Sequence, residues 1–484
     1  MTTILSIDQG TTGTTVVLYN EKSDIIGKAY REIPQLYPRP GWVEHDPEEI
    51  YRSVAEAVTE LLEKYPGPVA ATGITNQRET TVIWDKHTGK PVYNAIVWQC
   101  RRTAAECQKI KPHESMIRRK TGLPVDPYFS ATKIAWILDH IGRPSVDSLL
   151  FGTIDTYLIW KLTQGAVHAT DYSNASRSLL YNIHEKKWDD DLLTLFNIPN
   201  AILPEVKRSA DDYGRIETID GLKGTPILGV AGDQQAALFG QACFHPGQIK
   251  NTYGTGCFAV MNTGQSAIPS RQGLITTLAI DDACEPCFAL EGSIFIAGAV
   301  IQWLRDELRI IDHAGESEAL AQAVPDNGGV YIVPAFVGLG APHWDMEARG
   351  IITGLTRGSN RNHLIRAALE SMAYQSLDVI SIMEKESGLP VSALAVDGGA
   401  AGNDFLMQFQ ADILKKPVIR PKVIESTSLG AAYLAGLKAK IWNTVSELQD
   451  LKTLERHFLP GMDEKKRLSL IGGWREAVRK ALTK

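Results

Sequence analysis

The sequence predicts an α/β protein of two similarly built domains, and three observations lead to this prediction. The chain has 484 residues, more than a single hydrophobic core usually supports. Short apolar runs typical of strands are followed by longer runs with the apolar spacing of helices. A short strand followed by a Gly–Thr turn occurs once in each half, in residues 4–19 and in residues 250–258. We therefore expect domains over residues 1–242 and 243–484 that face a shared active-site cleft.

Composition excludes several classes of partner. The chain is 44% hydrophobic and 22% charged, which is typical of a soluble globular protein. Its formal net charge of -6 provides no basic surface for nucleic acid. The most apolar later stretch, residues 293–304, is too short to span a bilayer. The first residues, MTTILSIDQG, lack the features of a secretory signal. We expect a cytoplasmic protein with no nucleic-acid partner and no membrane insertion.

The first Gly–Thr turn lies in ILSIDQGTTGTTVVLY, where two β-branched runs predict a hairpin. Glycine N–H groups and threonine hydroxyls can bind phosphate oxygens, and Asp8 at the strand end can hold Mg²⁺ directly or through water. A decorated β-turn is the alternative. The order Asp-x-Gly-Thr-Thr directly after an N-terminal strand favours the phosphate site.

After the first turn the sequence predicts a structural helix and then a strand that ends in two opposite charges. Asp46 and Pro47 predict the start of a helix, which the Pro-Gly-Pro at residues 66–68 ends. The next strand leads into Arg78 and Glu79. Because hydroxyls both donate and accept, a guanidinium beside a carboxylate can hold a polyol. A surface ion pair of little energetic value is the alternative.

The middle of the chain reads GVAGDQQAALFG over residues 229–240, with Asp233 between an apolar strand and a helix-like run. An aspartate at such a junction can cap the helix. It can also serve as a base at the end of a strand. We expect both roles here.

Two further junctions lie in the second half. Residues 250–258, KNTYGTGCF, repeat the pattern of the first turn. Residues 362–386 and 405–414 have helical spacing, and between them VDGGAAGND follows a strand. Small residues there let a flat group such as adenine approach the backbone, although a tight strand-to-helix connection is an equal alternative. Residues 171–177 are predicted to be a polar loop without assigned chemistry.

The motifs of other enzyme classes are missing from the sequence. There is no P-loop, protein-kinase set, dinucleotide fingerprint, zinc-protease helix or esterase elbow. Two phosphate-type turns, an adenine-type junction, an isolated aspartate and a polyol-type pair together indicate phosphoryl transfer from a nucleotide to a hydroxyl.

Long runs of the chain resemble the FGGY family of carbohydrate kinases nearly end to end. These runs are GITNQRETT, NAIVWQCRRTA, DPYFSATK, AGDQQAALFGQ, KNTYGTGCF, VPAFVGLGAPHWD and VDGGAAGNDFLMQFQADIL. The resemblance implies an actin-like, ribonuclease H-like α/β fold, in which two domains with mixed sheets flanked by helices close on ATP and substrate. It also implies phosphorylation of glycerol by ATP with Mg²⁺, in a homo-oligomer of two or four chains.

The same resemblance assigns roles by position. Asp233 would take the proton from the terminal hydroxyl, and Asp8 would hold Mg²⁺. Glycerol would be bound by Arg78, Glu79, Trp98, Tyr128, Asp233, Gln234 and Phe258. ATP would be bound by Thr11, Thr12, Gly13, Gly254, Thr255, Gly298, Gln302, Gly399 and Asn403.

Two positions depart from patterns within the family. Thr15 stands where many members carry an arginine that meets the nucleotide phosphates, so we expect a raised requirement for ATP or Mg²⁺. Pro226 stands where members inhibited by fructose 1,6-bisphosphate place an arginine. Two other functions stay open: a kinase of a larger polyol or ketose, and a non-catalytic nucleotide-driven switch.

Overall fold

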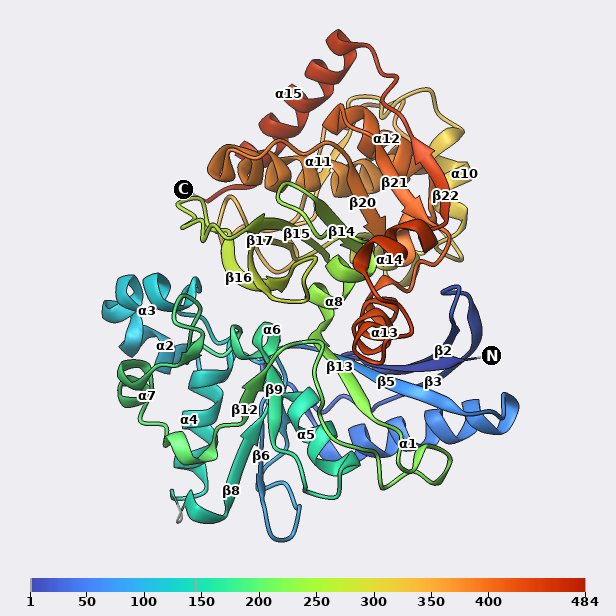
Figure 1. The fold of residues 1–484 in the computed structure, drawn as a ribbon. Coiled ribbons are helices and arrows are strands. Elements are labelled where there is room, and N and C mark those ends of the chain that lie inside the picture. Colours follow the sequence, from blue (N-terminus) through green and yellow to red (C-terminus); the bar gives the residue numbers. More distant parts are fainter. Residues whose placement is uncertain (1, 144–145, 484) are drawn as a thin grey trace.

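A computed structural model describes residues 2–143 and 146–483 of the chain. The chain forms two α/β domains, one below the other in Figure 1, and each is built around a mixed β-sheet. The predicted fold class is confirmed. The residue at which the two domains divide stays a prediction.

The sheet of the N-terminal domain has five strands in the order β13-β5-β1-β2-β3. The first three strands in sequence are antiparallel neighbours, whereas β5 and β13 run parallel to β1. The strands are β1 (Thr3–Gln9), β2 (Gly13–Asn20), β3 (Ile25–Glu32), β5 (Val69–Asn76) and β13 (Ile227–Gly232). Helix α1 (Pro47–Lys64) begins at the predicted cap, where the Asp46 side chain accepts the N–H of Glu48, and it packs on this sheet.

The sheet of the C-terminal domain has seven strands in the order β16-β17-β15-β14-β20-β21-β22. Strands β14, β15 and β17 are antiparallel neighbours, and β20 and β21 run parallel to β14, as in the first sheet. The two Gly–Thr turns therefore occupy equivalent places. The strands are β14 (Ile249–Tyr253), β15 (Cys257–Gly264), β16 (Ile275–Ile280), β17 (Pro286–Ile294), β20 (Leu394–Asp397), β21 (Val418–Pro421) and β22 (Leu454–Phe458).

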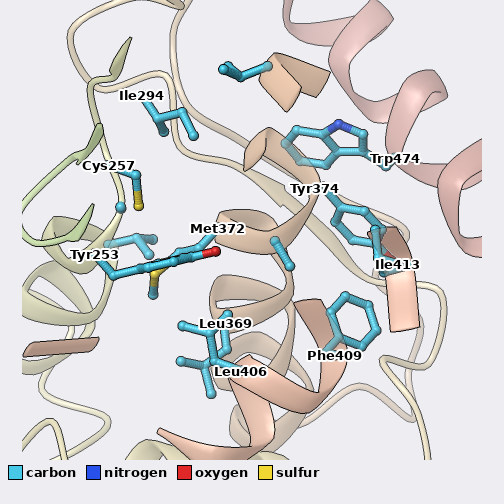
Figure 2. Close-up of a cluster of buried hydrophobic side chains, with 14 of the residues drawn as sticks. Tyr253, Cys257, Ile294, Leu369, Met372, Tyr374, Leu406, Phe409, Ile413 and Trp474 are labelled. Atoms are coloured by element: carbon cyan, nitrogen blue, oxygen red, sulfur yellow. The ribbon is translucent and has the colours of Figure 1, made fainter. Parts of the chain in front are cut away.

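Helices α11 (Arg361–Ser387) and α12 (Asp404–Leu414) contact this second sheet, and α15 (Glu464–Ala481) packs on these two helices. Figure 2 shows the core between them, where the rings of Tyr374 and Trp474 stack with centroids 5.2 Å apart. The first two of these helices match the runs predicted from apolar spacing.

A late helix, α13 (Ser426–Lys438), lies against the sheet of the other domain and against α8 (Asp233–Gly240). The approach is too close for side chains. A Cβ on Gly73 would lie 2.2 Å from the carbonyl oxygen of Ala431, and one on Gly430 would lie 1.8 Å from that of Ala236. Helix α8 also contacts strands of the C-terminal sheet, so these two helices form the layer between the sheets.

The remaining helices and strands are short and lie outside the two large sheets. Residues 171–177 are not a loop as predicted, because Asp171 caps the short helix α6 (Tyr172–Ala175). No helix among residues 2–143 and 146–483 is long and apolar enough to cross a membrane. The other elements are α2 (Ala104–Ile110), α3 (Glu114–Thr121), α4 (Ser130–His140), α5 (Ile154–Leu162), α7 (Asp190–Phe196), α9 (Gly298–Asp306), α10 (Glu316–Gln322), α14 (Val445–Leu451), β4 (Glu44–His45), β6 (Val82–Asp85), β7 (Ala95–Ile96), β8 (Leu149–Gly152), β9 (Ala169–Asp171), β10 (Tyr181–Asn182), β11 (Lys187–Trp188), β12 (Glu205–Lys207), β18 (Tyr331–Val333) and β19 (Ile351–Thr353).

Candidate active site

Four buried charges meet where the two domains touch. Glu291 of β17 accepts Arg78 Nη1 at 2.6 Å and Arg177 Nη2 at 2.9 Å, and Arg177 Nε donates to Glu79 at 2.6 Å. Each of the four side chains is at most 2% exposed. Two guanidiniums and two carboxylates balance one another, which is the condition under which charges tolerate burial. The surface-pair alternative for Arg78 and Glu79 is therefore wrong.

The backbone at Glu79 is strained in a way that fixes this cluster. Its φ angle of +61° lies in the left-handed region that residues with side chains rarely adopt. The carbonyl oxygen of Glu79 accepts bonds from Ser130 Oγ and Lys133 Nζ, each at 3.1 Å, and from the hydroxyl of Thr81. These donors hold the turn after β5 in place.

The electrostatics of the two carboxylates differ. Burial opposes the charge of Glu291, but the guanidiniums of Arg177 and Arg78 outweigh it and lower the pKa of Glu291 to about 2. Burial raises the pKa of Glu79, and its guanidinium neighbours offset only part of that effect. Glu291 is thus the firmly ionised partner that fixes both arginines.

Asp233 stands at the edge of this cluster. It is the first residue of α8, and its carboxylate is 30% exposed while Arg78 beside it is buried. Oδ1 accepts the N–H of Gln234 at 2.7 Å and lies 3.1 Å from Arg78 Nε. The cap position of α8 belongs to Gly232 and not to Asp233 as predicted, although Oδ1 of Asp233 does accept one free N–H of the first helical turn.

Three aromatic rings form a wall beside the charges. Trp98 and Tyr128 meet edge to face with centroids 5.5 Å apart, and Trp98 lies 6.5 Å from Phe258 of the other domain. The hydroxyl of Tyr128 accepts Arg78 Nη2 at 3.4 Å. The structure therefore brings the predicted polyol-binding side chains of both domains together.

Gln234 is held by a lysine. Lys250 Nζ, fully buried, donates to the side-chain oxygen of Gln234, to Thr252 Oγ1 at 2.8 Å and to the carbonyl of Phe258 at 3.2 Å. Burial lowers the pKa of Lys250 to about 8. With its oxygen occupied by this lysine, the amide of Gln234 has its two N–H donors left for a ligand.

The first Gly–Thr turn lies between β1 and β2. Gly10 N–H closes the turn on the carbonyl of Gly13 at 2.9 Å, and Thr11 and Thr12 form its tip. Asp8 is half-buried at the end of β1, and burial together with nearby Asp233 raises its pKa to about 7. Asp8 and Asp233 thus place two carboxylates near each other where burial disfavours negative charge, and a divalent cation would neutralise them.

The second turn packs on the start of α9. Gly298 N–H donates to the carbonyl of Gly254 at 2.9 Å, and the carbonyl of Thr255 accepts two further N–H groups of that helix start. Gly398, with φ +86°, would place a Cβ only 2.6 Å from the carbonyl of Tyr253, so the predicted adenine junction adjoins the second turn. Gly399 of that junction is exposed.

Two predicted nucleotide-binding side chains belong to helices beside the second turn: Gln302 to α9 and Asn403 to the start of α12. Gln302 is exposed on α9. Asn403 caps α12 by accepting the N–H of Leu406 at 2.9 Å, and its amide donates to Ser317 Oγ at 3.3 Å. Asn403 thus takes part in the strand-to-helix connection that is the alternative at this junction, and any contact with a nucleotide would come in addition to that role.

Comparisons with known proteins decide the family. Residues 3–240 match the profile of the FGGY family of carbohydrate kinases, N-terminal domain, and residues 249–439 match that of the C-terminal domain. The chain belongs to the FGGY family of carbohydrate kinases. Two relatives of this kinase are the glycerol kinase of Caldanaerobacter subterraneus subsp. tengcongensis, 58% identical, and glycerol kinase 2 of Thermotoga maritima, 56% identical. Each match covers 99% of this chain and 98% of the relative.

Solved structures agree with this assignment. The crystal structure of Plasmodium falciparum glycerol kinase with ADP is 39% identical and superposes with a TM-score of 0.93, covering 100% of this chain and 99% of that one. The ligand-bound xylulose kinase of Lactobacillus acidophilus superposes with a TM-score of 0.89 at 23% identity, covering 99% and 97% of the two chains. The second likeness concerns the fold alone.

Three charged residues of this kinase are not among those predicted from the sequence: Lys250, Arg177 and Glu291. Glu291 and Lys250 each lie in a strand whose other residues are uncharged, PCFALEGSI and IKNTY, and a lone charge in a buried strand is a usable signal. Arg177 has no such signal. It follows a short helix in a polar stretch, and its partners lie 98 and 114 residues away in sequence.

Proposed function

We propose that this kinase transfers the γ-phosphoryl group of ATP to a terminal hydroxyl of glycerol, with Asp233 as the general base. The observation that carries the proposal is the position of Asp233. Its carboxylate is partly exposed, whereas the four charged side chains of the cluster beside it are buried. It also lies next to Arg78, which donates to Tyr128 of the aromatic wall. Both contacts described for it use Oδ1, which leaves Oδ2 to accept a proton.

The acceptor side suits a small polyol. Arg78 and the amide of Gln234 supply donors, Glu79 and Asp233 supply acceptors, and a hydroxyl can use one of each. The carbon chain would lie on the wall formed by Trp98, Tyr128 and Phe258. As the hydroxyl oxygen bonds to the γ-phosphorus, its proton passes to Oδ2 of Asp233 and the bond from that phosphorus to the bridging oxygen breaks, which releases ADP. Holding hydroxyl and phosphoryl group in line supplies most of the acceleration.

The donor side uses the two turns. Thr11, Thr12, Gly13, Gly254 and Thr255 present N–H groups and hydroxyls that suit phosphate oxygens. Ribose and adenine would be received by Gly298, Gln302, Gly399 and Asn403. Mg²⁺ bound at Asp8 would neutralise charge on the phosphates. The relatives named glycerol kinase support the same substrates for this chain. Location in the cytoplasm and assembly into a homo-oligomer stay proposals drawn from the family resemblance.

Two alternatives are less well supported. A larger polyol or ketose is less well supported, because relatives 58% and 56% identical over nearly the whole chain are named glycerol kinases. A nucleotide-driven switch would not need an accessible carboxylate beside a hydroxyl-binding cluster.

Coupled detection of ADP release with glycerol and a panel of longer polyols tests the proposal. We expect glycerol to be preferred and Asp233→Asn to lower kcat by at least about a hundredfold. Asp378→Asn is the matched control, because Asp378 is a half-buried aspartate on α11 that accepts the indole N–H of Trp474 at 2.8 Å. Glycerol turnover that survives in Asp233→Asn excludes the base, and no turnover of glycerol by the wild type refutes the substrate.

A further inference from the structure

The carbonyl oxygens of Gly10, Thr11 and Thr12 each accept a hydrogen bond from a group outside the first turn. The carbonyl of Gly10 accepts Gln9 Nε2 at 2.7 Å and Gln77 Nε2 at 3.2 Å. The carbonyl of Thr11 accepts Gln35 Nε2 at 2.7 Å, and that of Thr12 accepts a backbone N–H at 3.0 Å. A carbonyl dipole that points toward a triphosphate would repel it. These hydrogen bonds keep the three carbonyl groups pointing away from the phosphate site, so that N–H groups of the turn can face the phosphates.

The orientation of Gln77 is fixed by its neighbours. Its Nε2 donates to Gln9 Oε1 at 3.1 Å, and its Oε1 accepts the hydroxyl of Thr80 at 3.0 Å. Nε2 of Gln77 also lies 3.3 Å from Nδ1 of His45. That amide nitrogen cannot accept, and its two hydrogens are shared among the carbonyl of Gly10, Gln9 Oε1 and Nδ1 of His45, so Nδ1 faces it as an acceptor.

The proton of His45 therefore sits on Nε2. This nitrogen lies 2.8 Å from Gln35 Oε1 and donates to it, so the amide nitrogen of Gln35 is the atom that faces the carbonyl of Thr11. His45 is fully buried, and burial lowers its pKa to about 4. A neutral ring with one tautomer thus links Gln77 to Gln35.

The chain of bonds also reaches the aromatic wall. The backbone N–H of Trp98 donates to Thr80 Oγ1 at 3.2 Å, and its indole N–H donates to Thr11 Oγ1 at 2.9 Å. Trp98 is thus connected to the first turn directly and through Gln77, His45 and Gln35. The buried members leave little freedom for the turn to change its conformation.

We infer that His45, Gln35 and Gln77 are positioning residues for ATP: by binding the carbonyls of Gly10 and Thr11 from behind, they keep the first turn in its phosphate-binding conformation. This inference rests on the proposed function, which assigns that turn to the phosphates of ATP. None of the three side chains is among those expected to touch glycerol or nucleotide.

His45→Asn and Gln35→Met test this inference at two points of the chain of bonds. Asparagine keeps an acceptor for Gln77 but does not reach Gln35, and methionine keeps the shape of Gln35 without its donor. We expect each variant to raise the KM for ATP about tenfold, as loss of one buried hydrogen bond would. The KM for glycerol should stay within about twofold of the wild type, since no bond to the acceptor site is removed.

A direct binding measurement accompanies the kinetics. Calorimetric titration with a non-hydrolysable ATP analogue and Mg²⁺ should show the same loss of affinity without turnover. His168→Asn is the matched control. His168 lies in the same domain, its Nε2 bonds to the carbonyl of Phe151 at 2.8 Å, and its ring packs on Trp84. We expect that variant to lower the melting temperature without changing the affinity for the analogue.

Unchanged affinity in both His45→Asn and Gln35→Met overturns the inference, as does an equal rise in the KM for glycerol. If His45→Asn does not fold, Gln35→Met alone decides, because Gln35 is only half-buried. A wild type without glycerol turnover would instead contradict the proposed function, and the titrations would still report on the first turn.

Discussion

Replacing Glu291 by glutamine should destabilise the protein and weaken glycerol binding together. Glu291 is fully buried and accepts three bonds from Arg78 and Arg177. Its pKa falls from 4.5 to about 2, which corresponds to about 3 kcal/mol of stability at neutral pH, since each pKa unit is worth about 1.4 kcal/mol. Breaking a buried ion pair costs about 3–5 kcal/mol, so the two estimates agree.

The sign of the pH dependence follows from the lowered pKa. The stabilisation is complete above pH 4.5, where the unfolded carboxyl is also ionised, and it is lost as the pH falls toward 2. Urea unfolding at pH 7 and at pH 3 should therefore show a larger difference between wild type and Glu291→Gln at pH 7. With Arg78 no longer fixed, the KM for glycerol should rise at least about tenfold while the KM for ATP changes little.

Glu370→Gln is the matched control. Glu370 is 1% exposed and paired with Arg366 at 2.8 Å in the same domain, but burial raises its pKa to about 7. Removing that charge at neutral pH should cost less than about 1 kcal/mol, because the folded protein gains little from it. Equal losses of stability in the two variants, or an unchanged KM for glycerol in Glu291→Gln, would refute the reasoning.

Three further changes have defined outcomes. Burial raises the pKa of Asp155 to about 7, so the folded state keeps a proton that the unfolded chain releases near pH 4, and stability falls as the pH rises between these values. Because Asp8 and Glu370 contribute in the same range, Asp155→Asn should lessen, and not abolish, the fall of the melting temperature from pH 5 to pH 8. In Gly298→Ala a Cβ would lie 2.6 Å from the carbonyl of Gly254, so the KM for ATP should rise about tenfold with that for glycerol unchanged. Thr15 pairs with Asp8 across β1 and β2, so Thr15→Arg should bring a cation to the phosphates and lower the KM for ATP, and an unchanged value counts against the role assigned to this position.

Local signals made the fold and much of the candidate site predictable. A strand followed by glycine and threonine identifies both turns, because hairpin chemistry depends on adjacent residues. Asp233 was found for the same reason, since a carboxylate between an apolar strand and a helix is visible within a dozen letters. The predicted capping position is wrong by one residue. Helix α8 begins at Asp233, so the capping residue is Gly232, which precedes it.

Residues paired across long distances in sequence could not be predicted in this way. Arg78 meets Glu291 213 residues later in the chain. Nothing near either residue specifies the other, because their contact depends on how β17 is placed against the turn after β5. His45 and Gln35 likewise look like ordinary loop residues until the tautomer and the amide orientations are worked out from the contacts around them.

The position of α13 has a consequence for how the protein is made. The face of the N-terminal sheet that contains Gly73 is covered by Ala431 and its neighbours, which a ribosome produces long after β13. At a synthesis rate of about 5–20 residues per second, that face stays uncovered for on the order of ten seconds or more before α13 is made. Its apolar residues are exposed to chaperones and to other nascent chains during this interval. A chain cut short before residue 426 would never bury them.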